Sequence, residues 1–397
     1  MNDKRNDTFT ILSAIGIILI LLGHLDLGIL TFAGVFPYYS YHVMIFVFIA
    51  GYFYKPADEG HIGAFILRKA KRLLIPYFIW NLIYGIVSTI LSDNGFEFAG
   101  KLNPYNLFIA PFMGGHQFGL NAAAWFVPAL FLSEVIDISV RAFFSAVCKA
   151  VTGKNKAKQR SGMTDDGNVI YGTKAEWIVM IMYLAVGMLA VWLSQRGSVY
   201  DAYRFPARLM LMAPALQFGR AYRTRLEKYD ITPWFIYFPL IFGMNILLGH
   251  VHGGLAYSTV WVTGFAGTPL TPFVTTLTGI ALWLRVAKIL GRLFSNGGDV
   301  AMKVFNFVGT HTFDIMMHHL ALFMIIKAIF AGLSGLTGAF KDFDMTAFKE
   351  DLYYTYVPGK MQWVKCIYLA LGLTLPALIG VLTHTLERFL KRGNRNG

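Results

Sequence analysis

Long apolar segments recur along the chain and are separated by short polar loops. We expect about ten of them to be spans, since each approaches the twenty or so residues that a helix needs to cross a bilayer core of roughly 30 Å. Their centres lie near Leu21, Val47, Tyr84, Leu130, Leu184, Met212, Phe242, Leu277, Leu320 and Leu373. The pattern predicts an all-α, polytopic transmembrane bundle built as a single integral membrane domain over residues 1–397. A short amphipathic helix is expected in an outer loop, near Met345–Tyr353.

Composition agrees with this prediction. The chain is 56% hydrophobic and only 14% charged, whereas soluble domains carry roughly a quarter of charged residues. Its mean hydropathy is +0.52. The aromatic content of 16% suits belts of Trp and Tyr at the two membrane interfaces.

The net charge of +13 follows the predicted topology. With the N-terminus inside, the basic clusters fall on alternate loops, which is the positive-inside pattern. These clusters are Lys4–Arg5, Lys55–Arg72, Lys149–Arg160, Arg220–Lys228, Arg285–Arg292 and Lys391–Arg395. Both termini are therefore expected in the cytoplasm, and anionic lipid rather than nucleic acid explains the charge. Arg196 and Arg204 depart from the pattern, as do Lys341, Lys349 and Lys360, because all five fall outside.

The first apolar segment, Phe9–Leu30, contains His24 deep within it. Burial disfavours the charged form of an imidazole, and a neutral imidazole can accept a proton from a substrate. An ionisable group inside a span is a functional-site hypothesis by default. In the alternative interpretation, His24 only hydrogen-bonds a neighbouring helix. His42 lies toward the outer end of the second span, where it either faces His24 or is solvated at the headgroup interface.

The ninth predicted span carries a polar face. His311, Asp314 and His318 are spaced i, i+3, i+7 and so share one side of a helix, with His319 about 100° further round. Such groups are costly in lipid and should face the bundle interior. They form a proton relay, or hydrogen bonds that position the acceptor, or a buried structural network in which Asp314 satisfies His318.

A basic segment flanks the inner end of the third span. Arg68, Lys69 and Arg72 lie in it, and they would attract either lipid phosphates or the phosphates of a cytosolic ligand. The chain contains no CxxC, HExxH or GxxxxGK[ST] pattern, so the sequence supports neither zinc chemistry nor nucleotide-driven transport.

Five elements occur in an order that resembles the acyltransferase 3 family of membrane O-acyltransferases. They are Gly16–His24, Tyr41–Tyr54, Arg68–Phe78, Ala124–Phe131 and Gly309–His319. Two positions depart from the family pattern. Ser13 stands eleven residues before His24, where the family has Arg or Lys, and Ala50 replaces a serine. Ser13 is about 16 Å from His24 along one helix face, so the family's cation would meet an acyl donor that enters from inside.

The resemblance implies transfer of an acetyl or other acyl group from cytosolic acyl-CoA to a hydroxyl of an extracytoplasmic glycan or surface polymer. Acetyl-CoA would be a co-substrate, with no tightly bound cofactor and no metal. His24 would act as general base, in a multi-pass protein of the plasma or inner membrane. The further catalytic candidates are His42 and His319; the donor-binding candidates are Ser13, Arg68, Lys69 and Arg72; and the oxyanion or acceptor candidates are Tyr52, Asn81, Trp125, Asp314 and His318.

Two alternatives remain open at this point. Ten spans and buried histidines also suit a transporter or exporter that performs no covalent chemistry. The serine at position 13 would also fit a family member that binds its ligands without turning them over.

Overall fold

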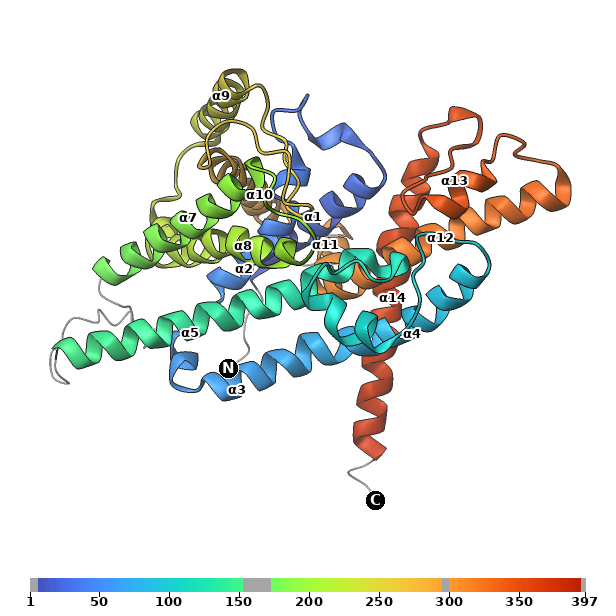
Figure 1. Cartoon of the computed structure of the whole chain (residues 1–397). Coiled ribbons are helices and arrows are strands. Elements are labelled where there is room, and N and C mark those ends of the chain that lie inside the picture. Colours follow the sequence, from blue (N-terminus) through green and yellow to red (C-terminus); the bar gives the residue numbers. More distant parts are fainter. Residues whose placement is uncertain (1–5, 153–172, 295–299, 394–397) are drawn as a thin grey trace.

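The computed structural model describes residues 6–152, 173–294 and 300–393, and in this part the long apolar segments form α-helices (Figure 1). The helices are α1 (Asp7–His24), α2 (His42–Tyr52), α3 (Ile62–Lys69), α4 (Ile75–Asp93), α5 (Phe126–Thr152), α7 (Thr173–Gln195), α8 (Arg204–Ala221), α9 (Trp234–His252), α10 (Thr271–Leu293), α11 (Val300–Thr310), α12 (Thr312–Thr337), α13 (Met345–Glu350) and α14 (Val364–Gly393). The β pairing in the described residues is a single bridge, Ser258–Thr263. The all-α prediction is confirmed.

Eight helical segments in the described residues are long and apolar enough to cross a membrane, so the chain is a multi-pass membrane protein. The expected count of about ten is not confirmed. The segment near Val47 forms α2, whose 11 residues reach only about 16 Å. The segment near Met212 forms α8, which contains Arg204, Arg208 and Arg220. The basic clusters predicted at Lys4–Arg5, Lys149–Arg160 and Lys391–Arg395 lie wholly or largely outside the residues whose side chains are described.

Helix α1 forms the centre of the bundle. It contacts α2, α10, α11, α12 and α14, and most of its apolar side chains are buried. In Figure 1 the neighbours α12, α13 and α14 gather on one side of it, and α9 lies at the opposite edge. A helix that is apolar all round is expected in such an interior position, so α1 carries its C-terminal histidine into the protein rather than into lipid.

The short helix α2 is held by an unusually close crossing with α8. A Cβ at Gly51 would lie 1.9 Å from the carbonyl oxygen of Leu216, and a Cβ at Gly219 would lie 2.0 Å from that of Phe48. Only glycine permits this approach of the two backbones. The crossing fixes α2, and with it His42 at the first position of that helix.

A network of buried charges joins α5, α7 and α8. Arg141 forms ion pairs with Asp137 at 3.0 Å and with Glu176 at 3.5 Å, and Arg220 pairs with Glu176 at 2.8 Å. All four side chains are buried. Arg220 therefore lies inside the bundle and is not a lipid-facing loop cation.

The short helix predicted near Met345–Tyr353 is confirmed as α13. The side chain of Asp344 caps it by accepting hydrogen bonds from the backbone N–H groups of Thr346 and Ala347, as expected for an N-cap aspartate. The segment after α13 is tied to the bundle by Lys327 of α12, whose Nζ donates to the carbonyl of Leu352 at 2.8 Å. This bond fixes the backbone next to Tyr353.

Candidate functional site

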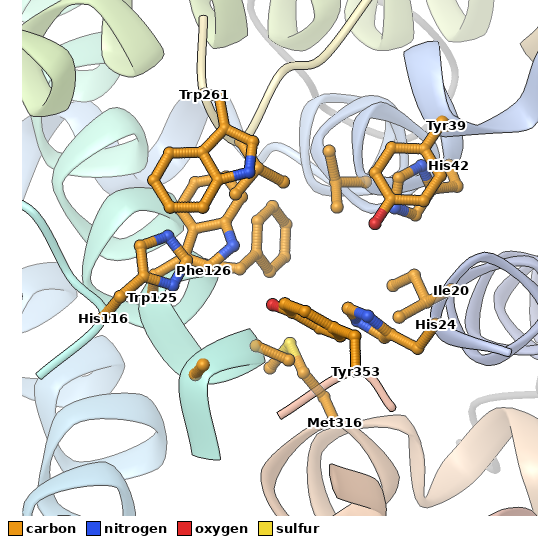
Figure 2. A pocket seen from close by; sticks show the side chains of 14 residues that line it. Ile20, His24, Tyr39, His42, His116, Trp125, Phe126, Trp261, Met316 and Tyr353 are labelled. Carbon is orange, nitrogen blue, oxygen red and sulfur yellow. The ribbon is translucent and has the colours of Figure 1, made fainter. Parts of the chain in front are cut away.

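A pocket lies at the C-terminal end of α1, where six segments distant in sequence meet (Figure 2). Its empty space is about 550 Å³, part of which is open to solvent. His24 and Ile20 come from α1, and Tyr39 and His42 come from the start of α2. His116 and Trp125 precede α5, Trp261 lies in the loop before α10, Met316 lies on α12, and Tyr353 follows α13. The lining is mainly aromatic, with three imidazoles among the side chains.

His24 is placed by the way in which α1 ends. The N–H of Leu25 bonds back to the carbonyl of Leu21, and Asp26 then adopts a φ of 49°, which turns the chain out of the helix. Gly23 has no side chain, and the ring of Tyr39 fills that space: a Cβ there would lie 2.7 Å from the ring. The last turn of α1 therefore presents His24 beside Tyr39 at the rim of the bundle interior.

The His24 ring has two aromatic neighbours. The ring of Tyr353 stacks on it, with centroids 5.4 Å apart and planes 6° from parallel, and the ring of His319 lies 5.1 Å away. The Nδ1 atom of His24 is buried without a hydrogen-bond partner among the described residues. An unpartnered buried nitrogen is uncommon in folded proteins, and a catalytic role is one explanation for it.

Backbone carbonyls set the tautomers of the two other catalytic candidates, His42 and His319. Nδ1 of His42 donates to the carbonyl of Tyr38, and Nδ1 of His319 donates to that of Ile315, each at 2.8 Å. A carbonyl can only accept, so Nδ1 carries the hydrogen and Nε2 of each neutral ring is the proton-accepting atom. Nε2 of His319 is buried and unpartnered. His42 lines the pocket, and His319 lies behind His24.

The predicted polar face of the ninth span is divided. His311 caps the start of α12 instead of lying within a continuous helix. The Asp314 carboxylate lies against α14, where a Cβ at Gly380 would be 2.2 Å from it. His318 instead bonds through Nδ1 to the hydroxyl of Tyr84 at 2.7 Å. The interpretation in which Asp314 satisfies His318 is therefore wrong, because the hydrogen-bond partner of the imidazole is the hydroxyl of Tyr84 on α4.

Of the five oxyanion or acceptor candidates, Trp125 alone is in the pocket lining. Asn81 is buried on α4, where its Oδ1 accepts from Nδ2 of Asn121 at 2.5 Å. Tyr52 lies at the far end of α2 from His42, bonded to Glu227 at 2.9 Å and 3.9 Å from the ring of Phe9. Phe9 begins α1, so Tyr52 is at the opposite end of that helix from His24.

The donor-binding candidates lie outside the lining of the His24 pocket. The Ser13 hydroxyl donates to the carbonyl of Phe9 in its own helix at 2.8 Å. Arg68 pairs with Asp58 at 2.9 Å, and Lys69 forms an ion pair with the buried Glu134. Arg72 is exposed.

Sequence reasoning missed His116, Trp261, Tyr39 and Tyr353, which all line the pocket from loops or short turns. The His116 ring stacks on Trp261, with centroids 5.0 Å apart, and its Nε2 accepts from Arg208 at 3.1 Å. Burial, followed by the nearby charges of Arg208 and Arg204, lowers the pKa of His116 to about 3. The aromatic content of the loops was the signal in the sequence that could have pointed to these residues. The residues that they contact are determined only by the fold.

The described residues contain no group of three or more His, Cys, Asp or Glu side chains placed to hold a metal ion. The fold and the site thus define a multi-pass membrane protein with a histidine-containing aromatic pocket at the end of its central helix. The chain belongs to the acyltransferase 3 family: the family's model, an acyltransferase domain, matches residues 8–381. Neither a curated protein nor a solved structure matches it. The protein is a membrane acyltransferase.

Proposed function

We propose that this acyltransferase moves an acetyl group from cytosolic acetyl-CoA to a hydroxyl of an extracytoplasmic glycan or other surface polymer, in the plasma or inner membrane. The observation that carries the proposal is the buried, unpartnered Nδ1 of His24 in an aromatic pocket. The pocket is open in part to solvent, which allows an acceptor hydroxyl to enter. His24 ends the central helix, so the pocket is at one face of the bundle.

In the proposed reaction, a ring nitrogen of His24 takes the proton of the acceptor hydroxyl while the oxygen attacks the thioester carbonyl carbon. The tetrahedral intermediate then collapses, the C–S bond breaks, and the proton on His24 passes to the leaving thiolate. General-base assistance of this kind contributes roughly 10²–10⁴-fold to a rate. No covalent acyl-enzyme is needed.

His319 and His42 have supporting roles in this proposal. Each carries its hydrogen on Nδ1 and offers Nε2 as an acceptor. His319 is 5.1 Å from His24 between ring centres, so its lone pair favours the positive charge that His24 acquires as it takes the proton. His42 is on the pocket wall, where its Nε2 can accept a hydrogen bond from a second hydroxyl of the acceptor and so orient the acceptor.

The donor is proposed to bind from the inner side. Arg68, Lys69 and Arg72 form a basic segment suited to the phosphates of CoA. Among them Arg72 is exposed, whereas Arg68 and Lys69 already have carboxylate partners. Ser13 offers only a hydroxyl, so charge recognition falls to this segment. For the oxyanion, Trp125 is the candidate that lines the pocket, and its indole N–H can donate.

The test is acyl transfer by the purified protein in sealed proteoliposomes. Acetyl-CoA labelled on the acetyl group is supplied on one side of the membrane and a soluble glycan acceptor on the other. We expect label on the acceptor and release of free CoA only when the donor is on the inner face. Proton-driven movement of solute without CoA release would contradict the proposal and favour a transporter.

A further inference from the structure

Two arginines at the start of α8 stand next to the pocket. Arg204 is its first residue and Arg208 follows one turn later. Arg208 is fully buried. Its guanidinium donates to the carbonyls of Val260 and Gly114, each at 2.7 Å, and to Nε2 of His116 at 3.1 Å. All these acceptors are neutral, so the hydrogen bonds satisfy the guanidinium without offsetting its charge.

Neither arginine has a carboxylate partner among the described residues. The ion pairs within the described residues involve cations other than Arg204 and Arg208. The Nε atom of Arg204 is buried and has no hydrogen-bond partner. Asp201, three residues earlier, is exposed and forms no ion pair with it. Arg141 and Arg220, which are buried like Arg208, differ in that they pair with carboxylates.

This arrangement is costly. Like charges four residues apart on a helix repel each other, and a buried charge without a partner costs several kcal/mol. Arg204 also departs from the positive-inside pattern, since the predicted topology puts it on the outer side. A fold that keeps two uncompensated guanidinium groups in one place is expected to use them.

Both guanidinium groups pack against residues of one wall of the pocket. The Arg208 guanidinium is 4.4 Å from the ring centre of Trp125, and that of Arg204 is 5.0 Å from the ring centre of Trp261. Trp125, Trp261 and His116 together form the side of the pocket that faces His24 and His42 across the cavity (Figure 2). A ligand at this wall would therefore meet a flat aromatic surface with two positive charges beside it.

We propose that this wall is a subsite for an anionic group of the acceptor, a carboxylate or a phosphate, with Arg204 as its direct partner. The inference rests on the proposed function, in which the pocket receives the acceptor. A guanidinium presents a planar fork of donors that matches either oxyanion, and the half-buried Arg204 forms none of the ion pairs described in the structure. Arg208, which already has three acceptors, positions His116 and Trp125. The acceptor class is thus a hydroxyl-bearing ring with a negative charge.

The test measures binding without acyl donor, so that it is independent of turnover. The full chain is placed in nanodiscs of zwitterionic phosphatidylcholine, and glucuronate, glucose 6-phosphate and glucose are titrated with ligand-detected NMR. We expect at least one anionic probe to bind about tenfold more tightly than glucose, the value of one charge-assisted contact. Comparison of the two anions distinguishes a carboxylate from a phosphate. Equal binding of all three probes, or no binding of either anion, would overturn the proposal.

Variants assign the preference to Arg204. Arg204→Gln should bring the anionic probe to the affinity of glucose, and Arg204→Lys should retain part of the preference. Arg196→Gln is the matched control, because Arg196 is an outer arginine that stacks on Trp192 at 4.0 Å, outside the pocket lining. A preference that survives in Arg204→Gln protein of unchanged melting temperature contradicts the assignment. Nanodiscs that contain phosphatidylglycerol test whether a lipid headgroup occupies the subsite. If the protein in these nanodiscs no longer binds the soluble anion more tightly than glucose, the assignment to the acceptor is contradicted.

Failure of this subsite and failure of the proposed function can be told apart. Acyl transfer to both neutral and anionic acceptors at equal rates would leave the acyltransferase function intact and remove the subsite. Selective binding of an anion without acyl transfer would support the subsite and contradict the acyltransferase function.

Discussion

The ring of Tyr353 stacks on the ring of His24 almost in parallel, with centroids 5.4 Å apart and planes 6° from each other. Tyr353 belongs to the segment after α13 and is 44% exposed, whereas His24 ends the central helix. This segment therefore contributes directly to the surroundings of the proposed base.

Replacement of Tyr353 tests this contact. Tyr353→Ala should lower kcat/KM for acyl transfer by about 2- to 10-fold, because an aromatic pair contributes roughly 0.5–1.5 kcal/mol. Tyr353→Phe keeps the stack and should stay near the wild-type value. Initial rates of CoA release measure both variants. If the Phe variant lost as much activity as the Ala variant, the hydroxyl and not the stack would be the important feature.

Lys327 should act through Tyr353. Its Nζ donates to the carbonyl of Leu352, the residue before Tyr353, so Lys327→Met should loosen the stack and reduce kcat/KM in the same direction. In the double variant with Tyr353→Ala the two effects should be less than additive, as expected for residues that share one contact. Full additivity in this double-mutant cycle would mean that Lys327 acts elsewhere.

The buried charge network of α5, α7 and α8 should dominate stability. Arg141→Ala leaves Asp137 and Glu176 buried without that partner, and breaking a buried pair costs about 3–5 kcal/mol. Arg68→Ala is the control, since Arg68 is mostly exposed and its pair with Asp58 should contribute at most about 1 kcal/mol. Thermal unfolding in detergent compares the two variants. Similar losses in both would show that the network is not a stabilising feature.

Stability should fall on acidification in a way that depends on His116. Burial, with Arg208 and Arg204, lowers its pKa to about 3 in the folded chain, while an unfolded histidine titrates near 6.5. Between these values the unfolded state binds a proton that the folded state does not, so stability is lost as the pH falls from about 6.5 toward 3. His116→Gln should show a shallower fall in melting temperature between pH 7 and pH 5. Parallel curves would mean that His116 does not contribute to the acid sensitivity.

The fold class was accessible from the sequence, because hydrophobic periodicity and charge placement directly reflect the bilayer. Span number was harder. The apolar run around Val47 has the length of a span, yet the helix there begins only at His42 and ends at Tyr52. The close crossing with α8 at Gly51 and Gly219 that holds it depends on two segments far apart in sequence.

The candidate site shows the same limit. His24, His42 and Trp125 could be chosen from the sequence because they lie in apolar segments or in the elements that resemble the family, and they line one pocket. His116, Trp261 and Tyr353 lie in loops, where no periodicity shows which way a side chain faces. Tyr52 shares a helix with His42, but its position ten residues away puts it at the other end of that helix. The spacing of residues along the sequence predicts which side chains share a helix face. It does not predict which other element packs against that face.

The most direct test of the account is acyl transfer by His24→Ala protein, with His250→Ala, an exposed histidine of α9 outside the pocket lining, as the control. Both variants are purified in parallel, and their melting temperatures confirm that they fold. The account predicts that CoA release and acceptor labelling fall by at least about 100-fold in His24→Ala and remain at the wild-type level in His250→Ala. Transfer at the wild-type rate by folded His24→Ala protein would contradict the role of His24 as the base.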